Sequence, residues 1–337
     1  MGKPVTHHDR AVKLHTESII IDGLNVSNWQ EKKSFETLAI GGLTAINATV
    51  AVWENYAETM DTMTRWYYLL FRKYADRIMP VKTVDDITNA KAEGKCGIIF
   101  GFQNSSPVED DLRRLTIFHK LGVRIIQITY NNSNLVGSGY LDSPEYGLSN
   151  FGRDFIAECN RLGILIDCSH VGYKTTMDAI EASEKPIAFT HTGPRALCDH
   201  PRNKTDEQLK ALAKKGGVVG VVALSTFLPA GDDSTLSDFF DALDYIVNLI
   251  GTEHVGIGCD FTEGWTAEKC RWLFTGRNVD SEPHYQIKWP LKYPNGISSA
   301  VDFPNLTRGL LDRGYSESDV KKIMGENFLR LFKEVWC

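Results

Sequence analysis

Two histidines in this sequence follow short apolar runs, and their residue types and spacing could form one site. Residues 164–170 are ILIDCSH, and residues 187–191 are IAFTH. A short apolar run that ends in polar residues is typical of a buried strand in a parallel sheet. Because parallel strands end at the same edge of a sheet, His170 and His191 are predicted to meet there. Imidazole nitrogens are common zinc ligands, so a metal site is the favoured interpretation, and simple hydrogen bonding at each strand end is the alternative.

The rest of the chain supplies strands and helices that could position such a site. Apolar runs predict eight strands, at residues 18–23, 43–52, 96–101, 123–130, 164–167, 186–190, 217–223 and 254–258. Helical periodicity predicts intervening helices at residues 54–74, 110–121, 151–162, 174–182, 205–214 and 236–250. Strands that alternate with helices in this way predict a (β/α)8 TIM barrel, with a doubly wound open sheet as the alternative.

The C-terminal part of the chain departs from this alternation. We predict that residues 1–337 form a single barrel domain with an aromatic-rich insertion at about 262–296 and C-terminal helices at about 300–335. The aromatic residues of the insertion are Trp265, Trp272, Phe274, Tyr285, Trp289 and Tyr293. The insertion follows the last strand on the side where sites form, so it either covers the pocket or serves as a structural flap or subunit interface.

Composition excludes several classes of protein. Of the 337 residues, 42% are hydrophobic and 24% are charged, and the net charge is -6 without a long basic run. These values fit a globular protein and argue against nucleic acid as a partner. The sequence contains no apolar stretch as long as a membrane span and no apolar core of a secretory signal near its start. The seven cysteines form no C-x-x-C pair, so they are predicted to be reduced thiols of a cytoplasmic protein.

Other polar residues at the predicted strand ends could also take part in chemistry. Asp260 follows the last predicted strand by two residues, and its carboxylate is a candidate catalytic or metal-binding group. A helix cap or salt bridge is the alternative for Asp260. Arg202 follows the sixth strand, where its guanidinium could bind a substrate carboxylate or form a surface salt bridge. Cys168 and Cys259 are expected to be small buried residues rather than nucleophiles.

Several of these segments together resemble the membrane (renal) dipeptidase family of metallopeptidases. The matching segments are Asp167-Cys168-Ser169-His170, Phe189-Thr190-His191, Arg202-Asn203, residues 256–261 (GIGCDF) and residues 325–330 (GENFLR). Their order and spacing hold from about Ser18 to Phe332.

The resemblance implies a fold, an activity and roles for individual residues. It implies a (β/α)8 barrel of the amidohydrolase type that holds two zinc ions, hydrolyses dipeptides, including those with a D-residue in second position, and forms a homodimer. It also implies that His170 and His191 bind metal, that Asp260 is the catalytic acid/base and that Arg202 binds the substrate carboxylate. Asn131, at the end of the fourth predicted strand, is expected to contact the substrate.

The sequence departs from the family pattern at positions that normally bind metal. The first strand of the family ends in Asp-Gly-His-Asn-Asp, and here the His and the second Asp are replaced by Leu24 and Val26. The family's metal-bridging Glu corresponds to Gln103, whose neutral amide is a weaker ligand. The family's His that polarises the scissile carbonyl corresponds to Tyr130, which is expected to donate to the oxyanion.

The sequence therefore predicts a divergent dipeptidase-family metallohydrolase of a small dipeptide-like or amino-acid-derived amide. At most one zinc ion is expected, bound by His170 and His191 with Gln103 as a weak third ligand. The expected partners are a small-molecule substrate and a second copy of the chain, and neither nucleic acid nor a membrane. Two alternatives stay open: a non-peptidase enzyme of small amine or amino-acid-derivative catabolism on the same barrel, and a catalytically inactive relative that binds a small molecule.

Overall fold

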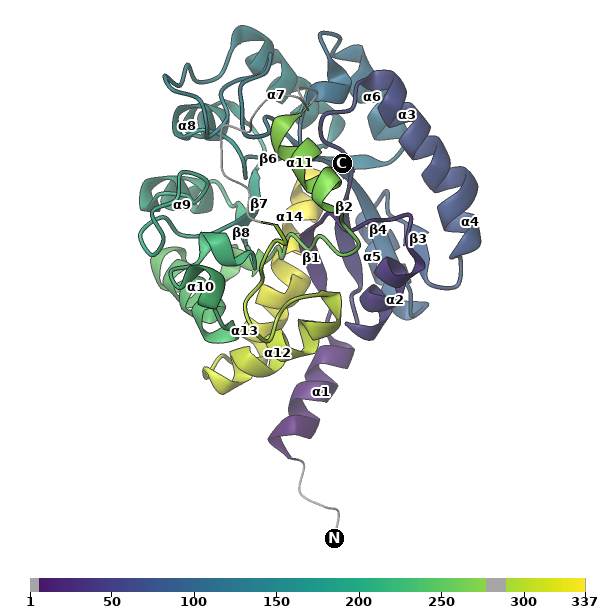
Figure 1. Ribbon diagram of the computed structural model, residues 1–337, viewed down its shortest axis with the longest axis vertical. Coiled ribbons are helices and arrows are strands. Elements are labelled where there is room, and N and C mark those ends of the chain that lie inside the picture. Colours follow the sequence, from purple (N-terminus) through teal and green to yellow (C-terminus); the bar gives the residue numbers. More distant parts are fainter. Residues whose placement is uncertain (1–5, 277–288, 337) are drawn as a thin grey trace.

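The computed structural model describes residues 6–276 and 289–336, in which a closed parallel barrel is surrounded by helices (Figure 1). The barrel strands are β1 (Ile21–Asn25), β2 (Ala45–Ala51), β4 (Cys96–Phe102), β5 (Val123–Gln127), β6 (Leu165–Asp167), β7 (Ala188–Thr192), β8 (Val218–Val221) and β9 (Val255–Ile257). The sheet runs in the order β2-β1-β9-β8-β7-β6-β5-β4, and β2 also pairs with β4 in parallel, which closes the ring. The predicted barrel is confirmed, and the open sheet is excluded.

Each of the eight predicted strands overlaps one strand of this barrel. The short strand β3 (Ile78–Pro80), which pairs with β4 next to the barrel, was not predicted. The helices are α1 (His7–Glu17), α2 (Lys32–Ile40), α3 (Tyr56–Arg65), α4 (Phe71–Lys73), α5 (Val84–Ala92), α6 (Arg113–Lys120), α7 (Asn150–Leu162), α8 (Tyr173–Ala182), α9 (Asp206–Lys214), α10 (Leu236–Ile250), α11 (Ala267–Thr275), α12 (Phe303–Asp312), α13 (Glu317–Lys321) and α14 (Asn327–Val335).

The ends of the helices that follow the site strands are set by residues with clear local roles. Thr205 caps α9, since its side chain accepts a hydrogen bond from the backbone N–H of Gln208. Gly163 ends α7 in the left-handed conformation with φ 73°. The predicted long helix at 54–74 is α3 and α4 joined by a π-helical turn at Trp66–Leu70. These short connections bring each strand back into the ring with its carboxyl end at the same face.

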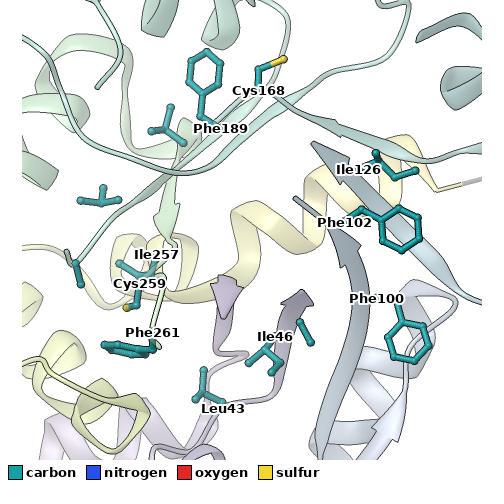
Figure 2. Close-up of a cluster of buried hydrophobic side chains, with 14 of the residues drawn as sticks. Leu43, Ile46, Phe100, Phe102, Ile126, Cys168, Phe189, Ile257, Cys259 and Phe261 are labelled. Carbon is teal, nitrogen blue, oxygen red and sulfur yellow. The ribbon is translucent and has the colours of Figure 1, made fainter. Parts of the chain in front are cut away.

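Two apolar layers hold the barrel together. The larger cluster joins strand side chains to the surrounding helices, and Figure 2 shows part of it, with Phe100 and Phe102 on β4 and Ile126 on β5. Cys168 and Cys259 belong to the same cluster and are buried, as the sequence predicted. A second cluster joins one side chain from each of seven strands to Phe328, Leu331, Phe332, Val335 and Trp336 in and just after α14. Helix α14 therefore packs where the strands begin, and the opposite end of the barrel is left for a site.

The predicted aromatic-rich insertion contains a helix that was not expected. Helix α11 crosses the region where the strands end, near the centre of the view in Figure 1. Its Leu273 packs against Val52, just after β2, and against Tyr130, just after β5. Tyr285 lies outside the described residues. Within the described ranges, none of the helices has the length and apolar character that crossing a bilayer requires.

Candidate active site

His170 and His191 lie at the carboxyl end of the barrel and face each other. Their Nε2 atoms are 3.0 Å apart, and both side chains are buried. Burial lowers the pKa of each imidazole well below its usual value, and the nearby positive charge of Arg202 lowers it further. The structure therefore brings together the two histidines that the sequence paired, in the neutral form that can bind a metal ion.

Each imidazole is held on its outer side by a different partner. The Nδ1 atom of His170 lies 2.7 Å from Oδ1 of Asn131. The Nδ1 atom of His191 lies 2.8 Å from Oγ1 of Thr190, whose hydroxyl donates to Oδ2 of Asp167 at 2.6 Å. Asn131, predicted to contact substrate, contacts His170 in the structure.

Asp260 lies at the same end of the barrel in a left-handed backbone conformation with φ 60°, which is uncommon outside glycine. Its N–H donates to the carbonyl of Leu24 at 3.0 Å, and its carbonyl accepts from the hydroxyl of Tyr293 at 2.9 Å. Burial raises the pKa of Asp260 to about 7, because the lowering effect of Arg202 is smaller than the cost of desolvating the carboxylate. A carboxyl group with this pKa can exchange a proton near neutral pH.

Asp22 supports the strand that carries Asp260. Its Oδ1 accepts a hydrogen bond from the backbone N–H of Cys259 at 2.9 Å and another from Leu24 at 3.4 Å. Burial raises the pKa of Asp22 to about 8, and these hydrogen bonds oppose that rise. Asp22 therefore fixes the backbone next to Asp260 rather than facing a ligand.

Tyr130 packs directly on His170. The two rings are stacked with centroids 4.3 Å apart, and the tyrosine is buried. Burial raises the pKa of its hydroxyl well above the usual value, and the negative charge of Asp260 raises it further. The hydroxyl therefore keeps its proton and can donate a hydrogen bond.

Arg202 lies behind the two histidines. Its Nη1 donates to the carbonyl of Ser169 at 2.5 Å and its Nη2 donates to the carbonyl of His191 at 2.6 Å. Its Nε has no hydrogen-bond partner in the part of the chain that the structure describes. The guanidinium thus braces the two segments that carry the histidines and keeps one donor unused.

A cavity of about 210 Å³ opens above this group. Its lining includes Tyr130, His170 and Asp260 among the predicted residues. The other predicted site residues do not line it: His191, Asn131, Arg202 and Gln103. Among the lining residues that the sequence did not single out are the aromatic Tyr140 and Phe227, the apolar Leu273, and the charged Asp232 and Lys292. They lie in loops and in α11, where no periodic pattern or motif marks a role.

Gln103 and Val26 line a second cavity of about 380 Å³ at the ends of β1, β2 and β4. The side-chain nitrogen of Gln103 donates to the hydroxyl of Thr49 at 3.0 Å. The indole N–H of Trp265 donates to the carbonyl of Val26 at 2.7 Å, and Trp265 and Leu273 line both cavities. The structure therefore places Gln103 in the neighbouring cavity, not in that of His170.

The barrel mouth carries few groups that could bind a metal ion. Leu24 and Val26 are buried apolar residues and cannot be ligands. His170 and His191 offer two nitrogen atoms at a suitable separation. Within the described ranges, no three His, Cys, Asp or Glu side chains are arranged to hold a metal ion.

Comparison with known proteins agrees with this architecture. The family model of the membrane dipeptidases (peptidase family M19) matches residues 7–270 and 291–336. The chain belongs to the membrane dipeptidase family.

Two curated relatives and two solved structures illustrate the similarity. Dipeptidase tcpJ of Claviceps purpurea is 31% identical over 287 residues, which are 83% of this chain and 61% of that protein. The uncharacterized dipeptidase C965.12 of Schizosaccharomyces pombe is 30% identical over 270 residues, 78% of this chain and 59% of that protein. The chain thus spans about three fifths of these relatives.

Among solved structures, an amidohydrolase from Pseudomonas aeruginosa is 43% identical with a TM-score of 0.93, covering 97% of this chain and 99% of that chain. A metallopeptidase from Rhodobacter sphaeroides, liganded with a phosphinate mimic of L-Ala-D-Ala, is 21% identical with a TM-score of 0.78, covering 95% of this chain and all of that chain (100%). The second similarity shows the fold alone.

Proposed function

We propose that this protein hydrolyses a small dipeptide-like or amino-acid-derived amide and uses at most one zinc ion, held by His170 and His191. The observation that carries the proposal is the pair of Nε2 atoms 3.0 Å apart, with His170 lining the same cavity as Asp260 and His191 buried behind it. Family membership supports the reaction class, and the names of the two curated relatives support a dipeptide-like substrate.

The residues of the chain supply the proton transfers of such a reaction. A zinc ion at this position would lower the pKa of the attacking water. Asp260, whose pKa is raised to about 7, accepts a proton from water and returns it to the leaving amine. The Tyr130 hydroxyl donates to the oxyanion that develops on the carbonyl oxygen.

Arg202 contributes positive charge under this proposal. It makes no ion pair with a carboxylate within the described residues, and its Nε is buried without a partner. An unpaired buried guanidinium favours an anionic group nearby, such as a substrate carboxylate. Because its two Nη groups bind backbone carbonyls and its side chain does not line the cavity, we propose that Arg202 acts on a substrate carboxylate through its charge.

One observation favours the second candidate, an enzyme or binding protein for a small amine. The cavity is lined by the rings of Tyr130, Tyr140, Phe227, Trp265 and Phe274 together with the carboxylate of Asp260. Aromatic faces and a carboxylate can hold an ammonium group.

We also propose that the protein is a cytoplasmic homodimer and that residues 1–337 form a single domain.

The test combines metal analysis with hydrolysis of a dipeptide panel. We expect at most one zinc per chain, weak turnover of ordinary dipeptides, and loss of this turnover in His170→Ala. The control is His8→Ala, which changes an exposed histidine on α1 and should leave zinc content and turnover unchanged. Two zinc ions per chain, or turnover that survives His170→Ala, would contradict the proposal, and binding of amines without any hydrolysis would favour the second candidate.

A further inference from the structure

Two polar side chains in the larger cavity form a hydrogen-bonded pair that leaves groups unused. Thr49 lies on β2 and Gln103 directly follows β4, and both line the cavity of about 380 Å³. The side-chain nitrogen of Gln103 donates to the Thr49 hydroxyl at 3.0 Å. The side-chain oxygen of Gln103 has no hydrogen-bond partner among the described residues, although the residue is only 2% exposed. Because buried polar groups normally have a partner, this oxygen favours a polar ligand in the cavity.

The pair offers one hydrogen-bond donor beside one acceptor. The Thr49 oxygen accepts from Gln103, so the Thr49 hydrogen stays available next to the Gln103 oxygen. If the amide of Gln103 were turned over, the Thr49 hydroxyl would donate to its oxygen, and the Gln103 N–H and a Thr49 lone pair would be available instead. One donor and one acceptor are therefore present in either orientation of the amide.

A primary carboxamide is a group that matches such a pair. Its C=O and one of its N–H bonds lie on the same side of the C–N bond, so it can accept from one group while it donates to the neighbouring one. A trans peptide bond directs its N–H and C=O to opposite sides and cannot do this. A carboxylate can only accept. The pair therefore selects a carboxamide over a peptide bond or an acid.

Indole rings form part of the same cavity. Trp29 and Trp66 are buried, line the cavity and have ring centroids 5.8 Å apart. The indole N–H of Trp29 is a second buried group without a partner in the part of the chain that the structure describes. Hydrogen bonds are stronger in buried surroundings of low polarity, so a carboxamide bound by Gln103 near these rings is held more firmly than at an exposed surface.

Charged side chains of both signs line the cavity as well. Asp61 and Arg65 lie one turn apart on α3, are exposed, and form no ion pair with a described residue. Glu54 and Lys269 add one charge of each sign. Acidic and basic side chains in equal number favour a ligand that carries both an ammonium group and a carboxylate.

We propose that this cavity is a binding site for a small zwitterion with a primary carboxamide, such as an α-amino acid with a carboxamide side chain. Thr49 and Gln103 bind the carboxamide, and the charged side chains bind the ammonium and carboxylate groups. The site does not depend on the proposed function, because none of these residues takes part in the proposed reaction. Among the described residues the two cavities share only Trp265 and Leu273, so Thr49 and Gln103 can be changed without altering the lining of the other cavity.

The experiment measures the binding of L-glutamine and L-asparagine to the full chain by isothermal titration calorimetry. The matched probes are the same amino acids with one methyl group on the side-chain nitrogen, which takes the place of the N–H on the side of the C=O. Gln103→Leu removes the amide at similar size, and Thr49→Val removes the hydroxyl. Thr64→Val is the control, because its hydroxyl donates to the carbonyl of Met60 on α3 and it does not line this cavity.

We expect the better-bound amino acid to lose about 5- to 100-fold in affinity in Gln103→Leu and in Thr49→Val, because each change leaves one hydrogen bond of the carboxamide unmade. Its methylated form should bind the wild type more weakly by a factor in about the same range, and Gln103→Leu should remove most of that difference. Arg65→Gln should weaken binding about two- to fivefold, as expected for an exposed charge pair. Thr64→Val should stay within about twofold of the wild type.

Three results would overturn the proposed site. They are no binding of either amino acid, equal binding of the methylated and unmethylated forms to the wild type, and affinity that is unchanged in both Gln103→Leu and Thr49→Val. If Gln103→Leu does not fold, the comparison of the methylated and unmethylated forms on the wild type and the Thr49→Val affinity still decide the question. None of these results bears on the proposed function, which zinc content and turnover test separately.

Discussion

The two sides of the barrel mouth differ in how their buried polar groups are satisfied. On the side of β5 to β9, His170, His191 and Asp167 form one connected set of hydrogen bonds. On the side of β1, β2 and β4, Leu24 and Val26 need no hydrogen bond, and the amide of Gln103 is bonded to Thr49. At the strand ends the first side carries imidazoles and a carboxylate, and the second carries two apolar side chains and a neutral amide. The charged side chains of the second cavity, Glu54, Asp61, Arg65 and Lys269, lie outside these positions.

Under the proposed function, this difference concerns the positions at which the family pattern has metal ligands. A buried carboxylate or imidazole without its metal would be costly, since polar groups removed from water need partners. Leu24 and Val26 avoid that cost, and Trp265 and Leu273 of the insertion pack over the changed surface. The outer hydrogen bonds of the two histidines on the other side involve none of Leu24, Val26 and Gln103.

The two sides still share one support. Asp22 lies on β1, the strand that lost its ligands, yet its carboxyl group accepts a hydrogen bond from Cys259, next to Asp260. Strand β1 therefore continues to hold the proposed acid/base in place.

The largest effect is expected on the side that kept its ligands. Asp260→Asn removes the proposed proton acceptor while keeping the size of the side chain, so kcat/KM should fall about 10²- to 10⁴-fold on whichever amide the wild type hydrolyses. Steady-state kinetics measures this loss, and circular dichroism checks that the fold is intact.

The matched change on the other side is Thr49→Val, which removes only the hydroxyl that accepts from Gln103. Its kcat/KM should stay within about threefold of the wild type, well short of the loss expected at Asp260. Equal losses in Asp260→Asn and Thr49→Val would contradict the proposed division between the two sides.

A smaller effect, on the stability of the fold, is expected for Leu273 in the insertion. Leu273 is 5% exposed, packs against Val52 and Tyr130, and lines both cavities. Leu273→Ala should lower the free energy of unfolding by about 2 kcal/mol, at the low end for a buried leucine because open space already adjoins it. Urea denaturation measures the change, and Leu69→Ala, at a residue that is 42% exposed, is the control with little expected effect. A stability loss no larger than the control's would mean that α11 does not pack on the barrel as described.

The sequence was sufficient to predict the barrel because the apolar runs of the strands are a strong local signal. Strand runs such as residues 217–223 and 254–258 correspond to β8 and β9 nearly to the residue. Helix α5 was missed although Thr83 and Asp86 form a capping box that could have marked its start. Helices α1 and α11 were also not predicted, because their sequences show little helical periodicity. Most residues of α1 are polar, and α11 lies within an irregular aromatic stretch.

For the site, residue types at strand ends predicted which side chains meet but not how they are bonded. His170, His191, Tyr130 and Asp260 come together because parallel strands end at one face. The contacts of Asn131 and Arg202 depend on loop conformation and on backbone carbonyls from distant segments, which no residue pattern encodes. Resemblance to a family supplied the roles of these residues, and only the geometry could show which atoms remain free to perform them.

The last prediction is a pH dependence of kcat/KM that tests the assignment of Asp260 as the proton acceptor. Because Asp260 must be ionised to accept a proton and its pKa is raised to about 7, kcat/KM should rise with pH below 7 and level off above it. The rise should approach tenfold per pH unit, as expected for a single ionising group. The residual kcat/KM of Asp260→Asn should not show this rise below pH 7 when both proteins are measured between pH 5 and 9. If the rise of kcat/KM below pH 7 persists in Asp260→Asn, another group on the β5 to β9 side accepts the proton, and the assignment of Asp260 is wrong.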